Sequence, residues 1–374
     1  MMRVLHVYSG NLYGGVESML FTLARERACE PALEPHFALS FPGRLAEELT
    51  AAGTPPHLLG EVRARRPDSV LRARRRLAAL LRERRFDAVV CHSAWPQALF
   101  GPVVRRAGLP LVFFLHDAAG GGHWTERWAR RTPPDLALCN SRFTLGTLLR
   151  LYPRAPAAVL HCPVAEPRTG PVDRAAVRRE LGTPADAAVI VRVARPEPWK
   201  GHAHLLEALG CLADVPGWVC WVVGGARRPH ERAHLEELRA LALARGVANR
   251  VRFTGERADV PRLLAAADLF CHSSTAPEPF GIAVVEALYA GLPVVATALG
   301  GPAEVLDGSC ALLVPPGDAG CLAEALRALL ASPERRQALG AAGPERARAV
   351  SSPAVQLPRL HELLRGTLAA RGAA

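Results

Sequence analysis

The chain has 374 residues, 49% of them hydrophobic and 22% charged, and its formal net charge at pH 7 is +11. This length exceeds what one ordinary hydrophobic core serves, so two domains of a globular protein are expected. No apolar run reaches the roughly 18 residues of a membrane span, and the N-terminus lacks the apolar segment of a signal peptide, which together predict a cytoplasmic protein.

Charge and cysteine content limit the classes of partner. The 46 basic against 35 acidic side chains favour an anionic small molecule, a membrane surface or nucleic acid, and Lys200 is the only lysine. The nine cysteines are scattered and never spaced C-x-x-C, which argues against a disulfide framework and a zinc cluster. We therefore expect reduced, mostly buried thiols.

Short apolar strands alternate with helical stretches along the first half. Strands are expected at residues 4–8, 35–41, 87–92, 111–116, 136–139 and 157–162, and helices at 15–27, 44–52 and between the later strands. This alternation is typical of a parallel sheet covered by helices on both faces. Ligands of such sheets bind beyond the carboxyl ends of the strands, where residues 11–17, His92 and the pair His116-Asp117 fall.

Two features of this half have a chemical interpretation. G-G-V-E at residues 14–17 opens a helix, so Gly15 would direct backbone N–H groups at a phosphate; the alternative is an ordinary glycine turn. His116 ends a buried strand, where a polar side chain often serves a ligand; the alternative is a hydrogen-bonded histidine under a loop. The glycines at 120–122 predict a mobile cover.

Residues 162–182 interrupt the alternation with proline, glycine and charge, and are the expected linker. Strands are then expected at 188–194, 218–223, 251–254, 269–272, 293–297 and 311–314, with helices between them. After a helix that begins near Asp318, two more helical stretches close the chain, the last over 353–368. The second half therefore predicts another parallel sheet with helices.

Arg195 and Lys200 follow the first strand of the second half, in R-P-E-P-W-K-G. Two cations five residues apart on a tight loop suit a diphosphate, which arginine binds with paired N–H groups and lysine as a point charge. The alternative is surface charge, but a single lysine in a chain rich in arginine favours a local function. We therefore predict a diphosphate clamp.

Residues 273–286, S-S-T-A-P-E-P-F-G-I-A-V-V-E, combine a rigid loop with the start of a helix. Pro277 and Pro279 prevent a helix before Phe280, and Gly281 allows a close approach of backbone to ligand. The following I-A-V-V-E-A-L-Y-A is typical of a buried helix. We predict that this stretch binds a donor sugar.

Two carboxylates lie in this stretch, Glu278 in the loop and Glu286 in the helix. From Phe280 to Glu286 the helix rises about 9 Å, so the two acids can hold opposite ends of an extended polar ligand. The N–H groups of Phe280, Gly281 and Ile282 lie between them and would bind the same ligand.

Three further motifs also have plainer explanations. H-E-x-x-H at residues 230–234 would supply two zinc ligands, but it lies on a helix that we expect to be exposed, with no evident third ligand. Residues 300–304 and 315–318 would complete the ligand floor, although turn chemistry alone explains their glycine and proline. A helix and its approach carry arginines that form either a solvated face or a site for an anionic bilayer or acceptor: Arg63, Arg65, Arg66, Arg72, Arg74, Arg75, Arg76, Arg82, Arg84 and Arg85.

Together these motifs resemble the retaining glycosyltransferases of family 4, or glycosyltransferase group 1. The resemblance rests on G-G-V-E, H-D, R-P-E-P-W-K-G, E-P-F-G-I-A-V-V-E, A-G-L-P-V-V-A-T, G-G-P-A-E-V and V-P-P-G-D, and is most specific from Arg195 onward. It implies an α/β chain with the GT-B fold, in which two facing Rossmann-like domains with parallel sheets enclose a deep interdomain cleft. Residues 1–168 would bind the acceptor, 169–350 the nucleotide sugar, and 351–374 would form a helix that crosses back to the first domain.

The resemblance also implies roles for single residues. Arg195 and Lys200 correspond to the diphosphate clamp. Glu278 corresponds to the acid on the donor sugar, and Glu286 to the acid on the ribose hydroxyls. The predicted catalytic residues are Arg195, Lys200, His116 and Glu278.

The remaining implied contacts come from backbone groups and from the first domain. The N–H groups of Phe280, Gly281 and Ile282 would bind sugar hydroxyls or the distal phosphate. Gly15 would lie near the phosphates and His116 beside the sugar.

The implied activity is transfer of a hexose from a nucleotide diphosphate sugar, such as a UDP-sugar, to an acceptor hydroxyl with retention of configuration. No Asp-x-Asp pair is present, so cationic side chains would stabilise the leaving diphosphate, and neither a metal nor a cofactor is expected. The family usually has glycine before this arginine and leucine after it; Ala194 and Pro196 stand here and bear on the choice of base or sugar.

The sequence leaves the acceptor open between a glycan, a lipid-linked and a small molecule, and predicts no nucleic-acid partner. The arginines at residues 63–85 predict a peripheral contact with the anionic inner face of the membrane. The alternatives are a nucleotide-sugar epimerase or a sugar-phosphate synthase on the same fold, a sugar-nucleotide-binding protein without turnover and, least favoured, a zinc peptidase.

Overall fold

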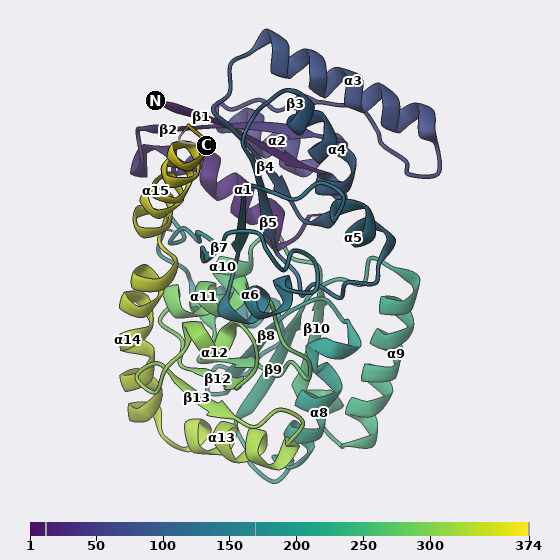
Figure 1. Ribbon diagram of the computed structural model, residues 1–374. Coiled ribbons are helices and arrows are strands. Elements are labelled where there is room, and N and C mark those ends of the chain that lie inside the picture. Colours follow the sequence, from purple (N-terminus) through teal and green to yellow (C-terminus); the bar gives the residue numbers. More distant parts are fainter. Residues whose placement is uncertain (12, 169, 373–374) are drawn as a thin grey trace. The chain divides into compact units, whose positions relative to one another are not determined.

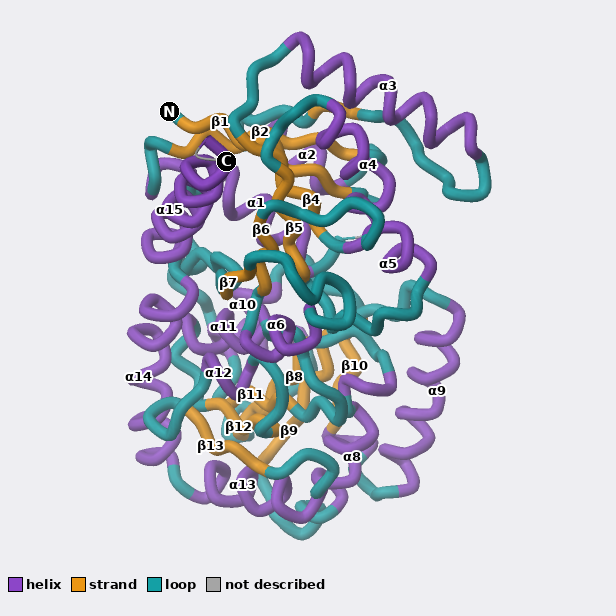
Figure 2. Tube along the Cα trace, in the orientation of Figure 1, coloured by secondary structure: helices purple, strands orange, loops and turns teal. Residues whose placement is uncertain are grey.

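The computed structural model describes residues 1–11, 13–168 and 170–372. Three parts of the predictions lie outside these ranges: Leu12 in the predicted segment 11–17, the predicted domain boundary at 169, and the last two residues of the predicted C-terminal helix. The chain divides into two compact units, Met1–Ala165 with Ser351–Ala374, and Glu166–Val350. Strands lie at the centre of each unit with helices around them (Figure 2).

The first unit contains a parallel sheet in the order β3-β2-β1-β4-β5-β6-β7 (Figure 1). Its strands are β1 Met2–Tyr8, β2 Leu33–Leu39, β3 His57–Leu58, β4 Ala88–His92, β5 Leu111–Leu115, β6 Leu136–Cys139 and β7 Ala157–Val159. Its helices are α1 Gly15–Arg25, the 3₁₀ turn η1 Arg27–Cys29, α2 Arg44–Ala51, α3 Pro67–Glu83, α4 Ala94–Arg106, α5 Trp124–Ala129, α6 Arg142–Leu148 and α15 Pro353–Gly372. Because α15 packs against α1 and η1, the end of the described chain belongs to the same unit as its beginning.

The second unit contains a parallel sheet in the order β10-β9-β8-β11-β12-β13. Its strands are β8 Ala188–Val193, β9 Trp218–Val223, β10 Val251–Gly255, β11 Leu269–His272, β12 Val294–Thr297 and β13 Ala311–Val314. Its helices are α7 Arg174–Glu180, η2 Pro198–Lys200, α8 His202–Gly210, α9 Pro229–Ala244, η3 Ala248–Arg250, α10 Val260–Ala266, α11 Ile282–Tyr289, α12 Pro302–Val305, α13 Ala319–Ala331 and α14 Pro333–Ser351.

Both sheets are covered on two faces, which explains their nearly continuous apolar strands. All residues of β4, β5 and β6 are buried in the first unit, as are those of β9, β11 and β12 in the second. The core of the second unit packs Trp218 and Leu269 of the sheet against Leu205 and Leu326 of α8 and α13. These cores fix the strand ends, from which the functional loops leave.

In each sheet the strand order reverses beside the unit's first strand. The reversal lies between β1 and β4 in the first unit and between β8 and β11 in the second. Loops that leave such neighbouring strands on opposite sides open a crevice at their carboxyl ends, where ligands of this fold class bind. Gly15 follows β1 and His92 ends β4, while Arg195 follows β8 and Glu278 follows β11.

Apart from their exact ends, the predicted elements are found in the structure, with two exceptions. Among the ends, β2 spans Leu33–Leu39 where 35–41 was predicted, and β7 ends at Val159 where 162 was predicted. β3 was not predicted, because two residues are too few to show an alternating pattern. The expected linker 162–182 is wrong in its second half, which contains α7. Asp173 caps this helix by accepting from the N–H of Ala176 at 2.9 Å, and Arg174 and Arg178 bind Asp268.

Among the described helices, none has the length and apolar content needed to cross a membrane.

Candidate active site

Two loops of the second unit, one after β8 and one after β11, are joined by hydrogen bonds. The Trp199 carbonyl accepts from the N–H of Thr275 at 2.9 Å, and the Ser273 hydroxyl donates to the Gly201 carbonyl at 2.8 Å. Gly201 has a φ of +70°, and a Cβ there would lie 1.8 Å from the Ser273 carbonyl oxygen. Only glycine fits at this position, which holds the neighbouring Lys200 against the β11 loop.

Lys200 and Glu278 form an ion pair between these loops. The ammonium nitrogen lies 2.7 and 2.6 Å from the two carboxylate oxygens, and the side chains are only 16% and 13% exposed. Burial by itself would raise the pKa of Glu278, but the Lys200 charge and a hydrogen bond from His272 outweigh it and hold the pKa well below its usual range. Burial lowers the pKa of Lys200, and the charge of Glu278 partly offsets this. Glu278 is therefore a carboxylate that already has a cationic partner.

A buried arginine lies behind this pair. Arg192 on β8 is 1% exposed and donates to the Lys200 carbonyl at 2.6 Å. His272, at the end of β11, lies 3.5 Å from Glu278 and 3.2 Å from the Ser274 hydroxyl. Burial and the Arg192 charge lower the pKa of His272 to about 4 despite its contact with Glu278, so this imidazole is neutral at pH 7. Arg192 thus orients the Lys200 backbone, and His272 orients the carboxylate.

Two carboxylates hold Arg195. Its Nη1 lies 2.5 Å from Glu231 and 2.9 Å from Glu197. Glu231 also accepts from the N–H groups of Arg227 and Arg228 at the start of α9. Burial would raise the pKa of Glu231, but these N–H groups and the Arg195 charge lower it below its usual value. The Arg195 guanidinium is therefore fixed by buried charge and is not a freely moving surface group.

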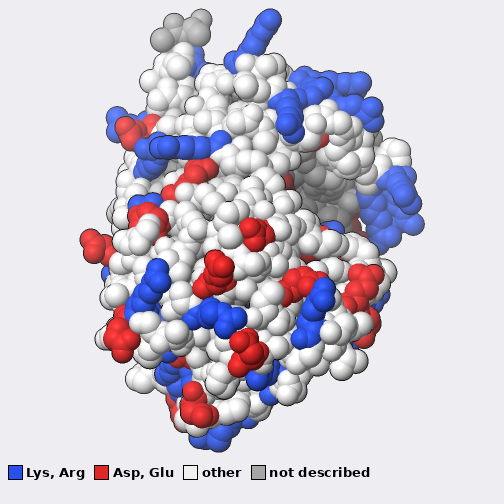
Figure 3. Space-filling model, turned by 90° about the horizontal axis from the view of Figure 1, so that it is seen from below, with Lys and Arg blue, Asp and Glu red and all other residues white. Residues whose placement is uncertain are grey.

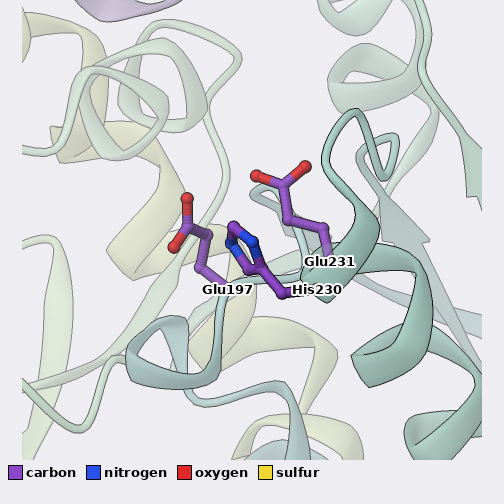
Figure 4. Close-up of side chains that lie close together, drawn as sticks. All are labelled: Glu197, His230 and Glu231. Carbon is purple, nitrogen blue, oxygen red and sulfur yellow. The ribbon is translucent and has the colours of Figure 1, made fainter.

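The H-E-x-x-H segment differs from its predicted environment. Glu231 is fully buried, so the expected exposure of the motif is wrong there; it closes the first turn of α9 as a capping residue. Glu197, His230 and Glu231 lie with their ligand-type atoms within 4.8 Å of one another (Figure 4). Both oxygens of Glu231 already accept hydrogen bonds, and His234 Nδ1 lies 2.9 Å from Glu237. The two histidines therefore do not converge on one ion with a free glutamate base.

α11 begins at Ile282, after Gly281 with a φ of +92°, as the loop-to-helix prediction required. The N–H of Gly301 donates to the Glu278 carbonyl at 2.8 Å. A Cβ at Gly300 would lie 2.3 Å from the same oxygen. The two glycines therefore have a packing reason beyond ordinary turn chemistry, because they let the β12 loop approach the Glu278 backbone.

Glu286 lies in the second turn of α11 and is partly exposed, and its carboxyl group makes no hydrogen bond or ion pair with the described residues. Burial raises its pKa to about 7. The N–H groups of Gly281 and Ile282 also have no acceptor within the described ranges. This carboxyl group and the start of the helix can therefore bind a polar ligand without first breaking a protein contact.

In the first unit, Gly14 caps α1 and Gly15 is its first residue. The Glu17 carboxylate accepts from the N–H of Gly14 at 2.9 Å. Burial and the nearby Glu17 charge raise the pKa of Tyr8 above its usual range. An acidic group thus lies beside the helix start that was predicted to meet a phosphate, so the contact through Gly15 stays a prediction.

His116 directly follows β5 and is 5% exposed. Its Nε2 lies 2.9 Å from Nδ1 of His92, and its carbonyl accepts from the Asn140 amide at 3.0 Å. In the glycine run that follows, the N–H of Gly120 donates to Glu126 of α5 at 2.8 Å. His116 is therefore hydrogen-bonded inside the fold, as the plainer interpretation expects, and its role beside a ligand stays a prediction.

Comparison with known proteins decides the family. Residues 173–346 match the model for Glycosyl transferases group 1, and residues 13–166 match that for Glycosyltransferase Family 4. A GDP-mannose-dependent alpha-(1-6)-phosphatidylinositol monomannoside mannosyltransferase of Mycolicibacterium smegmatis is 34% identical over 80% of this chain and 81% of its own length.

The chain belongs to the group 1 glycosyltransferases.

Two further comparisons describe how far the likeness extends. The lipopolysaccharide core biosynthesis glycosyltransferase LpsE of Rhizobium meliloti is 38% identical, but the match spans only 45% of this glycosyltransferase and 47% of LpsE. HepE of Anabaena, solved in complex with UDP and glucose, superimposes with a TM-score of 0.85 at 25% identity, over 98% of this chain and 100% of HepE. The two parallel-sheet units are those of the GT-B fold, which confirms the predicted fold class.

The structure brings together part of the site predicted for this glycosyltransferase. Lys200 and Glu278 are in contact, and Arg195 lies near enough for its charge to lower the pKa of Lys200. Gly15 and His116 belong to the other unit. The catalytic and donor-binding roles of all these residues stay predictions.

Sequence reasoning missed the roles of three residues that support the predicted site of this glycosyltransferase: Arg192, His272 and Glu231. Arg192 and His272 lie within buried strands. A polar side chain inside an apolar run of the sequence is the feature that could have identified them. Glu231 was visible as the third residue after Arg228 at a helix start, the position of a capping glutamate.

We expect Glu286→Gln in this glycosyltransferase to stabilise the fold at pH 8 and to change little at pH 5. The pKa of Glu286 rises from 4.5 to about 7, so between these values the folded protein binds more protons than the unfolded one, and wild-type stability falls as the pH rises. Glutamine does not ionise, and the gain at pH 8 is on the order of 2 kcal/mol. Urea unfolding at both pH values measures it, with the exposed helical Glu324→Gln as control. A pH-independent difference would contradict the assignment.

Proposed function

We propose that this chain transfers a hexose from a nucleotide diphosphate sugar to an acceptor hydroxyl, with retention of configuration and without a metal ion or cofactor. The observation that carries the proposal is the Lys200–Glu278 pair at the carboxyl ends of β8 and β11, with Arg195 beside it. Cations for a diphosphate and an acid for a sugar hydroxyl are thereby held at one point of one unit.

The proposed reaction exchanges one bond at the anomeric carbon. The bond from this carbon to the diphosphate oxygen breaks while the bond to the acceptor oxygen forms on the same face. The acceptor's proton passes to the departing phosphate, and the sugar passes through an oxocarbenium-like state. Lys200 and Arg195 stabilise the charge that builds up on the diphosphate, so catalysis rests on positioning and charge.

The other predicted residues orient the donor. Glu278 accepts a sugar hydroxyl, and the partly exposed Glu286 accepts the ribose hydroxyls. The N–H groups of Phe280, Gly281 and Ile282 supply donors for hydroxyl or phosphate oxygens at the start of α11. In the first unit, Gly15 and His116 are the proposed contacts to phosphate and sugar.

The relatives indicate which donors to test first. HepE was solved with UDP and glucose, and the Mycolicibacterium smegmatis relative is GDP-mannose-dependent. UDP-hexoses and GDP-mannose are therefore the first panel.

A thermal-shift screen with these donors tests the binding step. A donor present at 100 times its dissociation constant should add roughly 2.7 kcal/mol to the free energy of unfolding. NMR of the products formed with an acceptor panel, in buffer with and without EDTA, then tests transfer, retention and metal independence. Inverted product or loss of turnover with EDTA would overturn the corresponding part of the proposal.

The same screen separates the alternatives. An epimerase would change the sugar of the donor without any acceptor, and a sugar-phosphate synthase would require a phosphorylated sugar as acceptor. A binding protein without turnover would show the thermal shift but neither transfer nor donor hydrolysis.

The arginines around α3 differ in their surroundings, because some make structural contacts and others line a surface pocket. Arg74 donates to the Leu99 carbonyl at 2.6 Å and Arg72 pairs with Asp68 at 2.8 Å, so several of these arginines have structural contacts. A surface pocket of about 270 Å³ is nevertheless lined by Arg63, Arg66, Arg72 and Arg76, among others. In Figure 3 basic side chains gather towards the right-hand edge, the side on which α3 lies in Figure 1. Contact with an anionic membrane stays a prediction, which cosedimentation with anionic and neutral vesicles would decide.

A further inference from the structure

Three histidines lie on, or directly after, three neighbouring strands of the first unit's sheet. His6 is on β1, His92 ends β4 and His116 follows β5, and these strands are adjacent in the order β1-β4-β5. His6 Nδ1 lies 2.9 Å from His92 Nε2, and His92 Nδ1 lies 2.9 Å from His116 Nε2. The three rings therefore form one continuous hydrogen-bonded row across the sheet.

The ring geometry supports hydrogen bonds more than stacking. The centroids of His92 and His116 are 5.2 Å apart with an interplanar angle of only 11°. That separation corresponds to the 2.9 Å nitrogen distance plus one ring radius on each side, so the rings lie edge to edge and the N–H points at the lone pair. Phe114 stacks on His116 with centroids 4.3 Å apart, and Phe37 stacks on His6 at 5.5 Å. These aromatic contacts fix the ring planes.

All three imidazoles are neutral at pH 7. The side chains are 1%, 0% and 5% exposed in the order His6, His92, His116. Burial lowers the pKa of His6 and of His116 to about 3. Burial and the two neighbouring rings lower the pKa of His92 well below its usual value. Each ring therefore has one N–H and one lone pair.

A row of neutral imidazoles can have only two proton arrangements that keep both hydrogen bonds. Either every ring is protonated at Nδ1, or every ring is protonated at Nε2. In the second arrangement His6 would bury its Nε2–H, and this atom is enclosed with no partner in the described ranges. In the first it buries only a lone pair, and an unpaired acceptor is tolerated better than an unpaired donor.

We propose that His6 and His92 are positioning residues that fix His116 as the Nδ1–H tautomer, so that His116 serves as an uncharged hydrogen-bond donor to an oxygen of the bound sugar nucleotide. The Nδ1 atom of His116 is the outer end of the row and makes no hydrogen bond with the residues that the structure describes. The ligand in this inference rests on the proposed function, whereas the tautomer does not. His116 then neither removes nor supplies a proton during transfer.

NMR of the ligand-free protein tests the tautomer independently of activity. Long-range ¹H–¹⁵N correlation of histidine side chains at pH 7 distinguishes Nδ1–H from Nε2–H, and the His6→Phe, His92→Phe and His116→Phe spectra assign the three rings. We expect all three to be Nδ1–H and to remain unprotonated to pH 5. Nε2–H signals for these rings, or a protonated His116, would overturn the proposal while leaving the proposed function untouched.

Kinetics test the positioning role. His92→Phe should lower kcat/KM for the donor roughly 3- to 10-fold, the loss expected for one uncharged hydrogen bond, because His116 can then adopt either tautomer. His92→Gln keeps a donor and an acceptor and should recover most of the loss. His57→Phe on β3 makes the same substitution away from the row and should leave kcat/KM unchanged. Equal losses in His92→Phe and His92→Gln would contradict the role of the row.

Discussion

Lys200→Ala should lower kcat by about 10²–10³-fold with any accepted donor, the effect of removing one preorganised group that stabilises transition-state charge. Lys200 is the chain's only lysine, and its ammonium group is held by both carboxylate oxygens of Glu278 in the β11 loop. The donor KM should change much less, because in the proposed site Arg195 and the start of α11 would still bind the diphosphate. Steady-state kinetics with the donor found in the thermal screen measure both constants.

The variant also leaves Glu278 without its partner, which could lower activity through the fold alone. An unpaired, largely buried carboxylate should lower the free energy of unfolding by up to roughly 3 kcal/mol. The double variant Lys200→Met/Glu278→Gln removes both charges and should recover this stability without recovering turnover. If the double variant regained kcat, the role of Lys200 would be structural and the clamp assignment would be wrong.

Gly201→Ala should destabilise the second unit far more than Gly217→Ala, although both glycines have nearly the same backbone angle. Their φ values are +70° and +72°, so a side chain adds the same left-handed strain, about 1 kcal/mol, at either position. At Gly201 the added Cβ would also meet the Ser273 carbonyl at 1.8 Å, whereas at Gly217 nothing lies within 4 Å. We expect a total loss of at least roughly 3 kcal/mol at Gly201.

Urea unfolding of the two variants measures this difference. Because both variants add the same backbone strain, the difference between their free energies of unfolding reports the contact of the added Cβ with the Ser273 carbonyl. Gly201→Ala should also lower kcat, since the loop cannot hold Lys200 beside Glu278. Gly217→Ala should keep wild-type kinetics. Equal stability losses would mean that the loop moves away at little cost, and the close packing at Gly201 would then not be what positions Lys200.

The sequence predicted those features that local pattern determines. Apolar runs of four to six residues located nearly every strand, because both sheets are buried on two faces and leave a continuous signal. The proline, glycine and carboxylate pattern at residues 273–286 predicted a loop followed by a helix, and α11 begins where expected. The residues beside the two points where the strand order reverses could be predicted from the sequence, because the carboxyl ends of the strands define those positions.

The rest depended on contacts between distant residues. Nothing near Lys200 indicates that its partner is Glu278, 78 positions away, or that Glu231 would bind Arg195. His6 lies inside the first strand, where the sequence shows only a polar residue in an apolar run. Its hydrogen-bonded role is visible only in the structure, where β4 and β5 bring His92 and His116 into the same row. α7 was not predicted, because the proline and glycine residues that precede this short helix are typical of a linker.

The Lys200–Glu278 pair also bears on which anions can occupy this position. Since the ammonium charge is already compensated, inorganic phosphate gains little by approaching it, and its arrival would leave the carboxylate beside another negative group. In the proposed function, a nucleotide sugar would replace both halves of the pair at once, with phosphate oxygens for the lysine and hydroxyl groups for the glutamate. On that proposal, we expect the neutral pair to discriminate against small anions and to favour a ligand that combines a diphosphate with a sugar.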